Sequence, residues 1–157
     1  MKDIPIEVLW YGKNELLPKS TVLKAGKLEL TYESGIIRNI KLGDHELVRM
    51  IYVSVRDHNW ATVIPTIRNE QIEEKEGGFT ISYQSLFNQD DIQIDFKVRI
   101  SGTDENTIVF DIEGEALSDF QTNRTGFCLL HPIKECIGKT GEVVSPDGKI
   151  ESFFFQS

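Results

Sequence analysis

The chain has 157 residues, a formal net charge of −8 at pH 7 and two cysteines. A chain of this length is the size of one domain and buries about two-thirds of its unfolded surface, so we expect a core that needs no metal or disulfide. The acidic charge argues against the basic surfaces that nucleic acids and anionic membranes require, but it leaves room for a neutral sugar, or for a sugar acid bound by local arginines.

The first 20 residues are expected to be loosely attached. The sequence predicts a short first strand before Tyr11 and a linker over residues 11–20. The opening residues, MKDIPIEVLW, lack the basic and apolar regions of a signal peptide. No apolar run approaches the roughly 20 residues that a membrane helix requires. We therefore expect a cytoplasmic protein.

Apolar and polar residues alternate with a period of two through the rest of the chain, as in DIQIDFKVRI, residues 91–100. This pattern is typical of a strand with one buried and one solvated face. The expected buried faces comprise Leu28, Leu30, Tyr32, Phe79, Ile81, Tyr83, Ile92, Ile94, Phe96, Val98, Ile100, Ile108, Phe110 and Ile112. Turn residues separate the strands at 33–35, 43–44, 77–78, 102–104 and 146–148. The sequence thus predicts one all-β domain over residues 1–157, an antiparallel β-sandwich with little or no helix.

Two predicted strands are apolar on both faces, which is typical of central strands covered above and below. In residues 45–57, one face carries Leu47, Ile51, Val53 and Val55, and the other carries Val48, Met50 and Tyr52. In residues 126–132, Phe127 and Leu129 oppose Cys128 and Leu130. We expect the second face to be covered by the other sheet, a long loop or another domain.

The first of these strands ends in the polar sequence RDHNW. Strand alternation places Arg56 and Trp60 on one side, and Asp57 and Asn59 on the other. One interpretation is a sugar site in which Trp60 packs against the ring and the polar side chains bind hydroxyl groups. The other is a structural junction in which Trp60 closes the end of the core while Asp57 and Asn59 hold a sharp turn.

The second polar sequence is NRTGFCLLHP, which begins with Asn123 and Arg124. His131 lies at the end of its apolar strand and is a candidate general acid or base, since its pKa is near neutrality. The alternative is a hydrogen-bonded core histidine. Cys128 lies three residues before His131 and therefore faces the opposite side of the strand, which argues against a Cys–His pair. The two cysteines, Cys128 and Cys136, fit no zinc pattern, so we expect free thiols, no bound metal and no cofactor.

The runs over residues 23–60, 115–132 and 143–155 resemble the N-terminal part of the D-apionate lactonase family. The most specific blocks are YVSVRDHNW and NRTGFCLLHP. The resemblance implies a galactose mutarotase-like β-sandwich, also called a supersandwich, followed by a C-terminal barrel that resembles glycoside hydrolases. It further implies hydrolysis of the lactone of a branched sugar acid, with the chemistry mainly in the barrel. Mutarotases use a His and a Glu; His131 is the candidate here, but no motif places the Glu.

Three hypotheses follow. The first is a non-catalytic N-terminal module whose partner is the C-terminal catalytic domain of the same parent chain. The second is a self-sufficient carbohydrate-binding or mutarotase-like domain that takes a sugar or sugar acid. Its pocket would be formed by Arg56, Asp57, Asn59, Trp60, Asn123, Arg124 and His131. The third is self-association through edge strands and the apolar residues 153–155.

Overall fold

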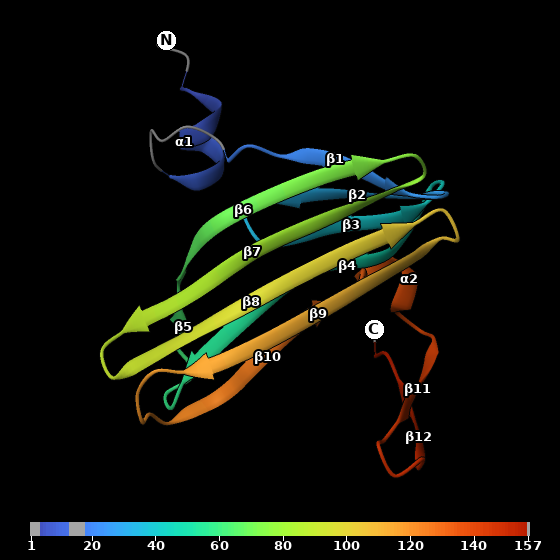
Figure 1. Cartoon of the computed structure of the whole chain (residues 1–157). Coiled ribbons are helices and arrows are strands. Elements are labelled where there is room, and N and C mark those ends of the chain that lie inside the picture. Colours follow the sequence, from blue (N-terminus) through green and yellow to red (C-terminus); the bar gives the residue numbers. More distant parts are fainter. Residues whose placement is uncertain (1–3, 13–17, 157) are drawn as a thin grey trace.

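A computed structural model describes residues 4–12 and 18–156. Figure 1 shows two antiparallel sheets stacked face to face, which confirms the predicted all-β sandwich. Sheet A contains β1 (Thr21–Ala25), β2 (Leu28–Glu33), β3 (Ile36–Leu42), β4 (His45–Asp57), β5 (Thr62–Val63) and β10 (Thr122–Leu130). Sheet B contains β6 (Pro65–Lys75), β7 (Gly78–Gln89), β8 (Ile92–Thr103) and β9 (Thr107–Ala116). The strand orders are β1-β2-β3-β4-β10, with β5 also paired to β4, and β6-β7-β8-β9.

The core fills the space between the two sheets. The predicted inner residues of β2, β7 and β8 are buried, while those of β9 are partly buried and pack against them. Two buried tyrosines form hydrogen bonds in the core: the Tyr83 hydroxyl donates to the Gly35 carbonyl at 3.0 Å, and the Gly35 amide donates to the Tyr32 hydroxyl at 2.9 Å. This network ties the β2–β3 turn of sheet A to β7 of sheet B.

The predicted first strand is wrong, because residues Ile6–Tyr11 form the short helix α1. Pro5 precedes the helix, and Gly12 ends it in a left-handed conformation with φ 70°, from which its amide donates to the Val8 carbonyl. Both residue types are common at these positions, since proline costs no helical hydrogen bond at the start and glycine adopts positive φ freely. Residues 13–17 of the predicted linker lie outside the described residues. Within the described ranges, no helix is long and apolar enough to cross a membrane.

The two doubly apolar strands differ in position. β4 is a central strand, as predicted, but Leu47 is 46% exposed while Val48 packs against the core. The inward side of β4 changes between Val48 and Ile51, and the facing stretch of β3 contains Asn39, which has a positive φ of 52°. β10 is not central: in the part of the chain that the structure describes, it pairs with β4 alone and is an edge strand.

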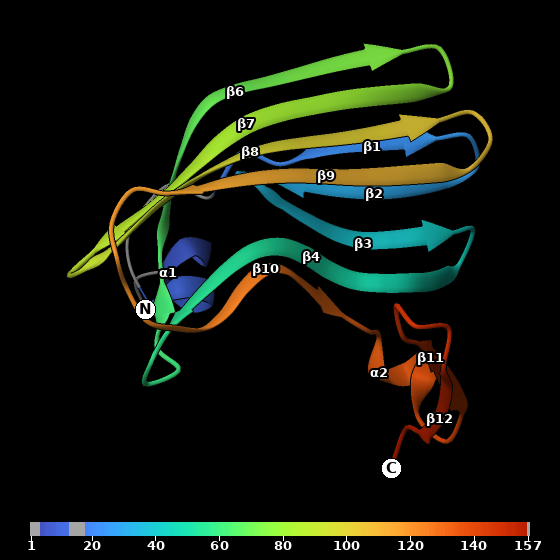
Figure 2. The same ribbon diagram turned by 60° about the horizontal axis from the view of Figure 1, so that its bottom comes forward.

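A separate C-terminal unit follows β10. It consists of helix α2 (Ile133–Cys136) and the hairpin of β11 (Thr140–Val144) and β12 (Ile150–Phe154). Figure 2 shows the unit on the side of sheet A that faces away from sheet B, with the hairpin extending away from the sandwich. The predicted turn at 146–148 connects its two strands, and the Gly148 amide donates to the Ser145 carbonyl at 2.8 Å.

Candidate functional site

A pocket of 480 Å³ lies on the outer face of sheet A, where β4 and β10 pair. The register places Arg124 opposite Arg56 and Gly126 opposite Ser54. Because side chains alternate along a strand, these residues face away from the core, while their neighbours Val53 and Val55 are buried in it. The pocket is lined by Ser54, Arg56, Trp60, Arg124, Thr125, Gly126, Phe127 and Cys128, and we call it the arginine pocket.

The two arginines give the pocket a positive character. Arg124 lies with its guanidinium carbon 5.8 Å from the centre of the Trp60 ring, within the range of a cation–π contact. Arg56 donates to the Tyr52 hydroxyl at 3.2 Å. A hydrogen bond with the Cys128 thiol, together with burial, raises the pKa of Tyr52, so this hydroxyl is neutral at physiological pH. In residues 4–12 and 18–156, no carboxylate forms an ion pair with either guanidinium.

A tight turn at the end of β4 positions Trp60. The Asp57 carboxylate accepts hydrogen bonds from the amides of Asn59 at 2.8 Å and Ala61 at 2.9 Å. Trp60 adopts a left-handed conformation with φ 69°, which is uncommon for a large side chain and is stabilised by these bonds. Trp60 is 59% exposed, so the interpretation that it closes the end of the core is wrong. The interpretation that Asp57 and Asn59 hold a sharp turn is confirmed for Asp57, whereas the Asn59 side chain bonds the His58 ring instead.

Asn123 fixes the same turn from β10. Its amide nitrogen donates to the carbonyls of Asp57 at 3.2 Å and His58 at 2.6 Å. The adjacent Thr122 hydroxyl donates to the Arg56 carbonyl at 2.6 Å. Pairing shifts register between Thr122 and Arg124, which leaves Asn123 free to reach across to the turn.

Replacing Asp57 with alanine is expected to destabilise the domain by about 1 kcal/mol, because two backbone amides lose a charged acceptor. Urea unfolding would measure the change. Asn59→Ala is the matched control, since the Asn59 side chain bonds only the exposed His58 ring and its loss is expected to have little effect. Equal unfolding curves for wild type and Asp57→Ala would contradict this role.

The candidate residues therefore divide into three groups. Arg56, Trp60 and Arg124 line the arginine pocket. Asp57, Asn59 and Asn123 instead form hydrogen bonds within the turn that follows β4. His131 does not converge with them, which corrects that part of the second hypothesis. It follows Leu130 at the far end of β10, about 23 Å from Arg124 at the usual rise per residue. Its exposed ring packs against Phe155, with centroids 5.7 Å apart.

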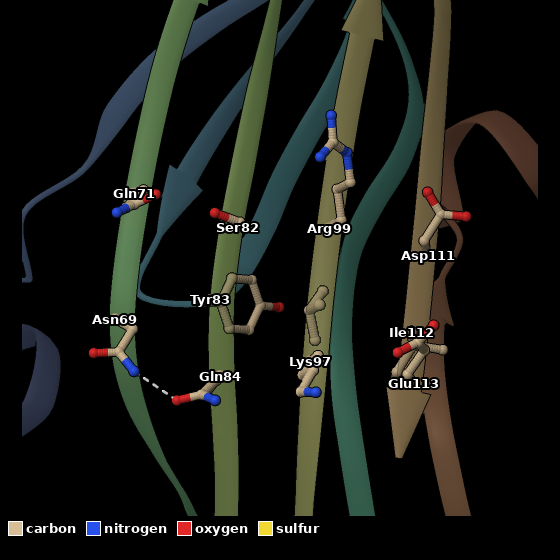
Figure 3. A pocket seen from close by; sticks show the side chains of 11 residues that line it. Asn69, Gln71, Ser82, Tyr83, Gln84, Lys97, Arg99, Asp111, Ile112 and Glu113 are labelled. Carbon is tan, nitrogen blue, oxygen red and sulfur yellow. Dashed lines mark hydrogen bonds between the residues drawn. The ribbon is translucent and has the colours of Figure 1, made fainter.

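A second hollow, of 600 Å³, crosses the outer face of sheet B (Figure 3). The sequence does not predict it, since the polar residues that alternate along residues 91–100 indicate only a solvated face. The register pairs Lys97 with Glu113 and Arg99 with Asp111, so opposite charges lie on neighbouring strands. The remaining polar lining comes from Asn69, Gln71, Ser82 and Gln84, with Asn69 donating to Gln84 at 2.6 Å. The sequence could have indicated this groove only if the pairing of these strands had been known.

Comparison with known proteins identifies the family. The profile described as D-apionate lactonase, N-terminal domain, matches residues 8–157. The chain belongs to this family. It is also 35% identical to the D-apionate lactonase of Brucella anthropi over 144 residues. This aligned stretch is 91% of this chain and 24% of that protein. No solved structure gives a significant match.

The chain thus spans about a quarter of the D-apionate lactonase that it matches. The two blocks that carry the resemblance, YVSVRDHNW and NRTGFCLLHP, lie on β4 and β10 and in the residues that follow each strand. These two strands are hydrogen-bonded neighbours, so the blocks meet at the arginine pocket although they are far apart in sequence.

Proposed function

We propose that the chain is a non-catalytic docking domain of a D-apionate lactonase-like hydrolase that acts on sugar-acid lactones. Its C-terminal unit would pack on the catalytic part of the longer protein. The observation that supports this most directly is the apolar surface of the unit. Exposed large apolar side chains gather there and at the adjoining end of β10: Leu129, Leu130, Ile133, Ile137, Val143, Val144, Ile150, Phe153 and Phe154.

A two-stranded hairpin is marginally stable when it stands alone in water. Here β11 and β12 pair with each other and with no other strand in the described part of the chain. Successive side chains of β12 point to opposite faces of the hairpin. Since the consecutive residues Phe153 and Phe154 are both exposed, both faces carry apolar side chains. Clustered apolar surface of this kind marks an interaction site, and burying it would stabilise the hairpin.

The edge of β10 adds a second contact. This strand carries apolar side chains on both faces, yet its outer edge has no partner strand in the described ranges. A covering domain would protect both the unpaired backbone groups and Leu130. On this proposal, the catalytic part of the longer protein would be what covers the second face of β10, although β10 is not a central strand.

The histidines support a non-catalytic role. His45, His58 and His131 are all exposed, and none lines either hollow described above. An acid–base catalyst normally requires a positioned partner and a sheltered site.

Both cysteines are free, in agreement with the sequence-based prediction, and we keep the expectation of a reducing, cytoplasmic location.

The test adds the purified chain to the Brucella anthropi protein from which the matching N-terminal domain has been removed. We expect a complex by gel filtration with light scattering, and at least a tenfold loss of affinity in Phe154→Asp, since a buried aromatic contact is worth more than about 1.4 kcal/mol. Ile72→Asp on β6 is the matched control, because Ile72 is an exposed apolar residue of the opposite sheet.

Two outcomes would overturn the proposal. Turnover of a sugar lactone by the chain alone would show that the domain is itself catalytic. Failure to form the complex would remove the docking role, and a dimer of the chain that Phe154→Asp dissociates would assign the apolar surface to a second copy.

A further inference from the structure

Arg56 and Arg124 form an uncompensated pair of like charges. They lie directly opposite each other on neighbouring strands and on the same face, an arrangement that destabilises a sheet when nothing neutralises it. The chain has 25 acidic and 17 basic residues, so carboxylates are plentiful. None of those in the described part of the chain is placed to form an ion pair with either arginine.

Two other arginines on the same sheet are compensated. Arg38, on the neighbouring strand β3, lies 3.5 Å from a Glu33 oxygen, and Arg49 lies 2.7 Å from Glu46. In the sheet B groove, Lys97 and Arg99 each face an acidic residue on the next strand. The arginine pocket therefore differs from the other charged surfaces described here in having two cations and no anion.

The shape of the pocket leaves room for a ligand. Gly126 forms part of its floor with φ 130°, and a Cβ atom built there would meet no other atom within 4 Å. Trp60 forms a wall, and Ser54, on the same face as Arg56, is the hydroxyl-bearing residue of the lining. A volume of 480 Å³ falls within the range of small-molecule sites.

We propose that the arginine pocket binds a small hydroxylated carboxylate. The two guanidinium groups would hold the carboxylate, for which their planar donors are well suited. The Trp60 ring would pack against the C–H groups of the ligand, and its hydroxyl groups would bond the polar lining. This binding role does not depend on the docking role of the C-terminal unit, because the pocket is complete within β4, β10 and the turn between Asp57 and Ala61.

The test is calorimetric titration of the full 157-residue chain with gluconate. Three further probes test which chemical groups of gluconate are recognised. Glucitol has the hydroxyl groups without the carboxylate, and propionate has the carboxylate without the hydroxyl groups. Inorganic phosphate is a different anion. We expect gluconate to bind at least about tenfold more tightly than glucitol and more tightly than propionate or phosphate. Quenching or enhancement of Trp60 fluorescence, absent in Trp60→Phe, would place the ligand at the pocket.

Variants assign the binding to the arginines. Arg124→Gln and Arg56→Gln are each expected to weaken gluconate binding about tenfold or more. Arg68→Gln is the matched control, since Arg68 is an exposed arginine on β6 of sheet B, and His131→Ala should also bind normally. Thermal melting of each variant would show that it remains folded.

Several results would overturn the inference. Equal affinity for glucitol and gluconate would show that the charge is not recognised, and unchanged binding by both folded arginine variants would place the ligand elsewhere. Tighter binding of phosphate would make the pocket a phosphate site. None of these results bears on complex formation through the C-terminal unit, so the two proposals fail separately.

Discussion

Replacing Phe87 with alanine is expected to lower the free energy of unfolding by about 3–5 kcal/mol. The Phe87 side chain is 0% exposed, and its ring meets that of Phe96 edge to face, with centroids 5.8 Å apart. Truncation removes a large apolar side chain from a packed interior and leaves a cavity that its neighbours only partly fill. Urea unfolding followed by far-ultraviolet circular dichroism would measure the loss.

Phe154→Ala makes the same chemical change at a surface position and serves as the control. Phe154 is 59% exposed on the terminal hairpin, so its removal is expected to change stability by less than about 0.5 kcal/mol. A comparable loss in both variants would contradict the assignment of Phe87 to the shared core and of Phe154 to an open surface.

Raising the pH above about 10 is expected to destabilise the domain by about 3 kcal/mol per pH unit, through two buried phenols. Burial, reinforced by a hydrogen bond to Glu70, raises the pKa of Tyr32, and burial with the nearby Glu70 charge raises the pKa of Tyr83. The folded state therefore keeps both protons where the unfolded chain, with an ordinary tyrosine pKa of about 10, releases them. Stability from these groups is complete below that pH and decreases as the pH rises through and above it.

Unfolding free energies measured between about pH 11 and about pH 12 would give this slope, and those near pH 10 about half of it. Tyr83→Phe removes one of the two phenols and is expected to reduce the slope attributable to them by about half. The variant also loses the hydrogen bond to the Gly35 carbonyl. This loss lowers the free energy of unfolding by a similar amount at every pH below the titration, so it does not affect the comparison of the two slopes. Identical slopes in wild type and variant would contradict the burial of Tyr83 as a neutral group.

The buried faces were predictable because a strand alternates its side chains strictly. Ile92 to Ile100 of β8 show this most clearly, since every second residue is apolar and every one of these is buried. The same reasoning errs at Leu47, because the inward side of β4 changes between Val48 and Ile51, opposite the positive φ of Asn39, and residue types do not show this change. Helix α1 was also missed, since six residues are too few to show a helical period.

The candidate site was only partly predictable, because it depends on which strands pair. Arg56 and Arg124 were both selected from the sequence, but their direct opposition follows from the pairing of β4 with β10. Strand alternation does not apply beyond Asp57, because the chain turns there. The sequence pattern therefore does not show that Asp57 holds the turn while Trp60 lines the pocket. The second hypothesis places His131 in the same pocket because it is only seven residues from Arg124 in the sequence. An extended strand, however, carries these two residues to opposite ends of β10.

The late arrival of β10 in sheet A has a consequence for synthesis on the ribosome. The Thr122 hydroxyl and the Arg56 carbonyl that it bonds are 66 residues apart in the chain, and all of sheet B lies between them. While those intervening residues are being translated, one side of β4 has no native neighbour and is open to pairing with other nascent chains. Closing this long-range contact is entropically slow, so we expect the final strand addition to limit the folding rate and to be the step at which chaperones assist.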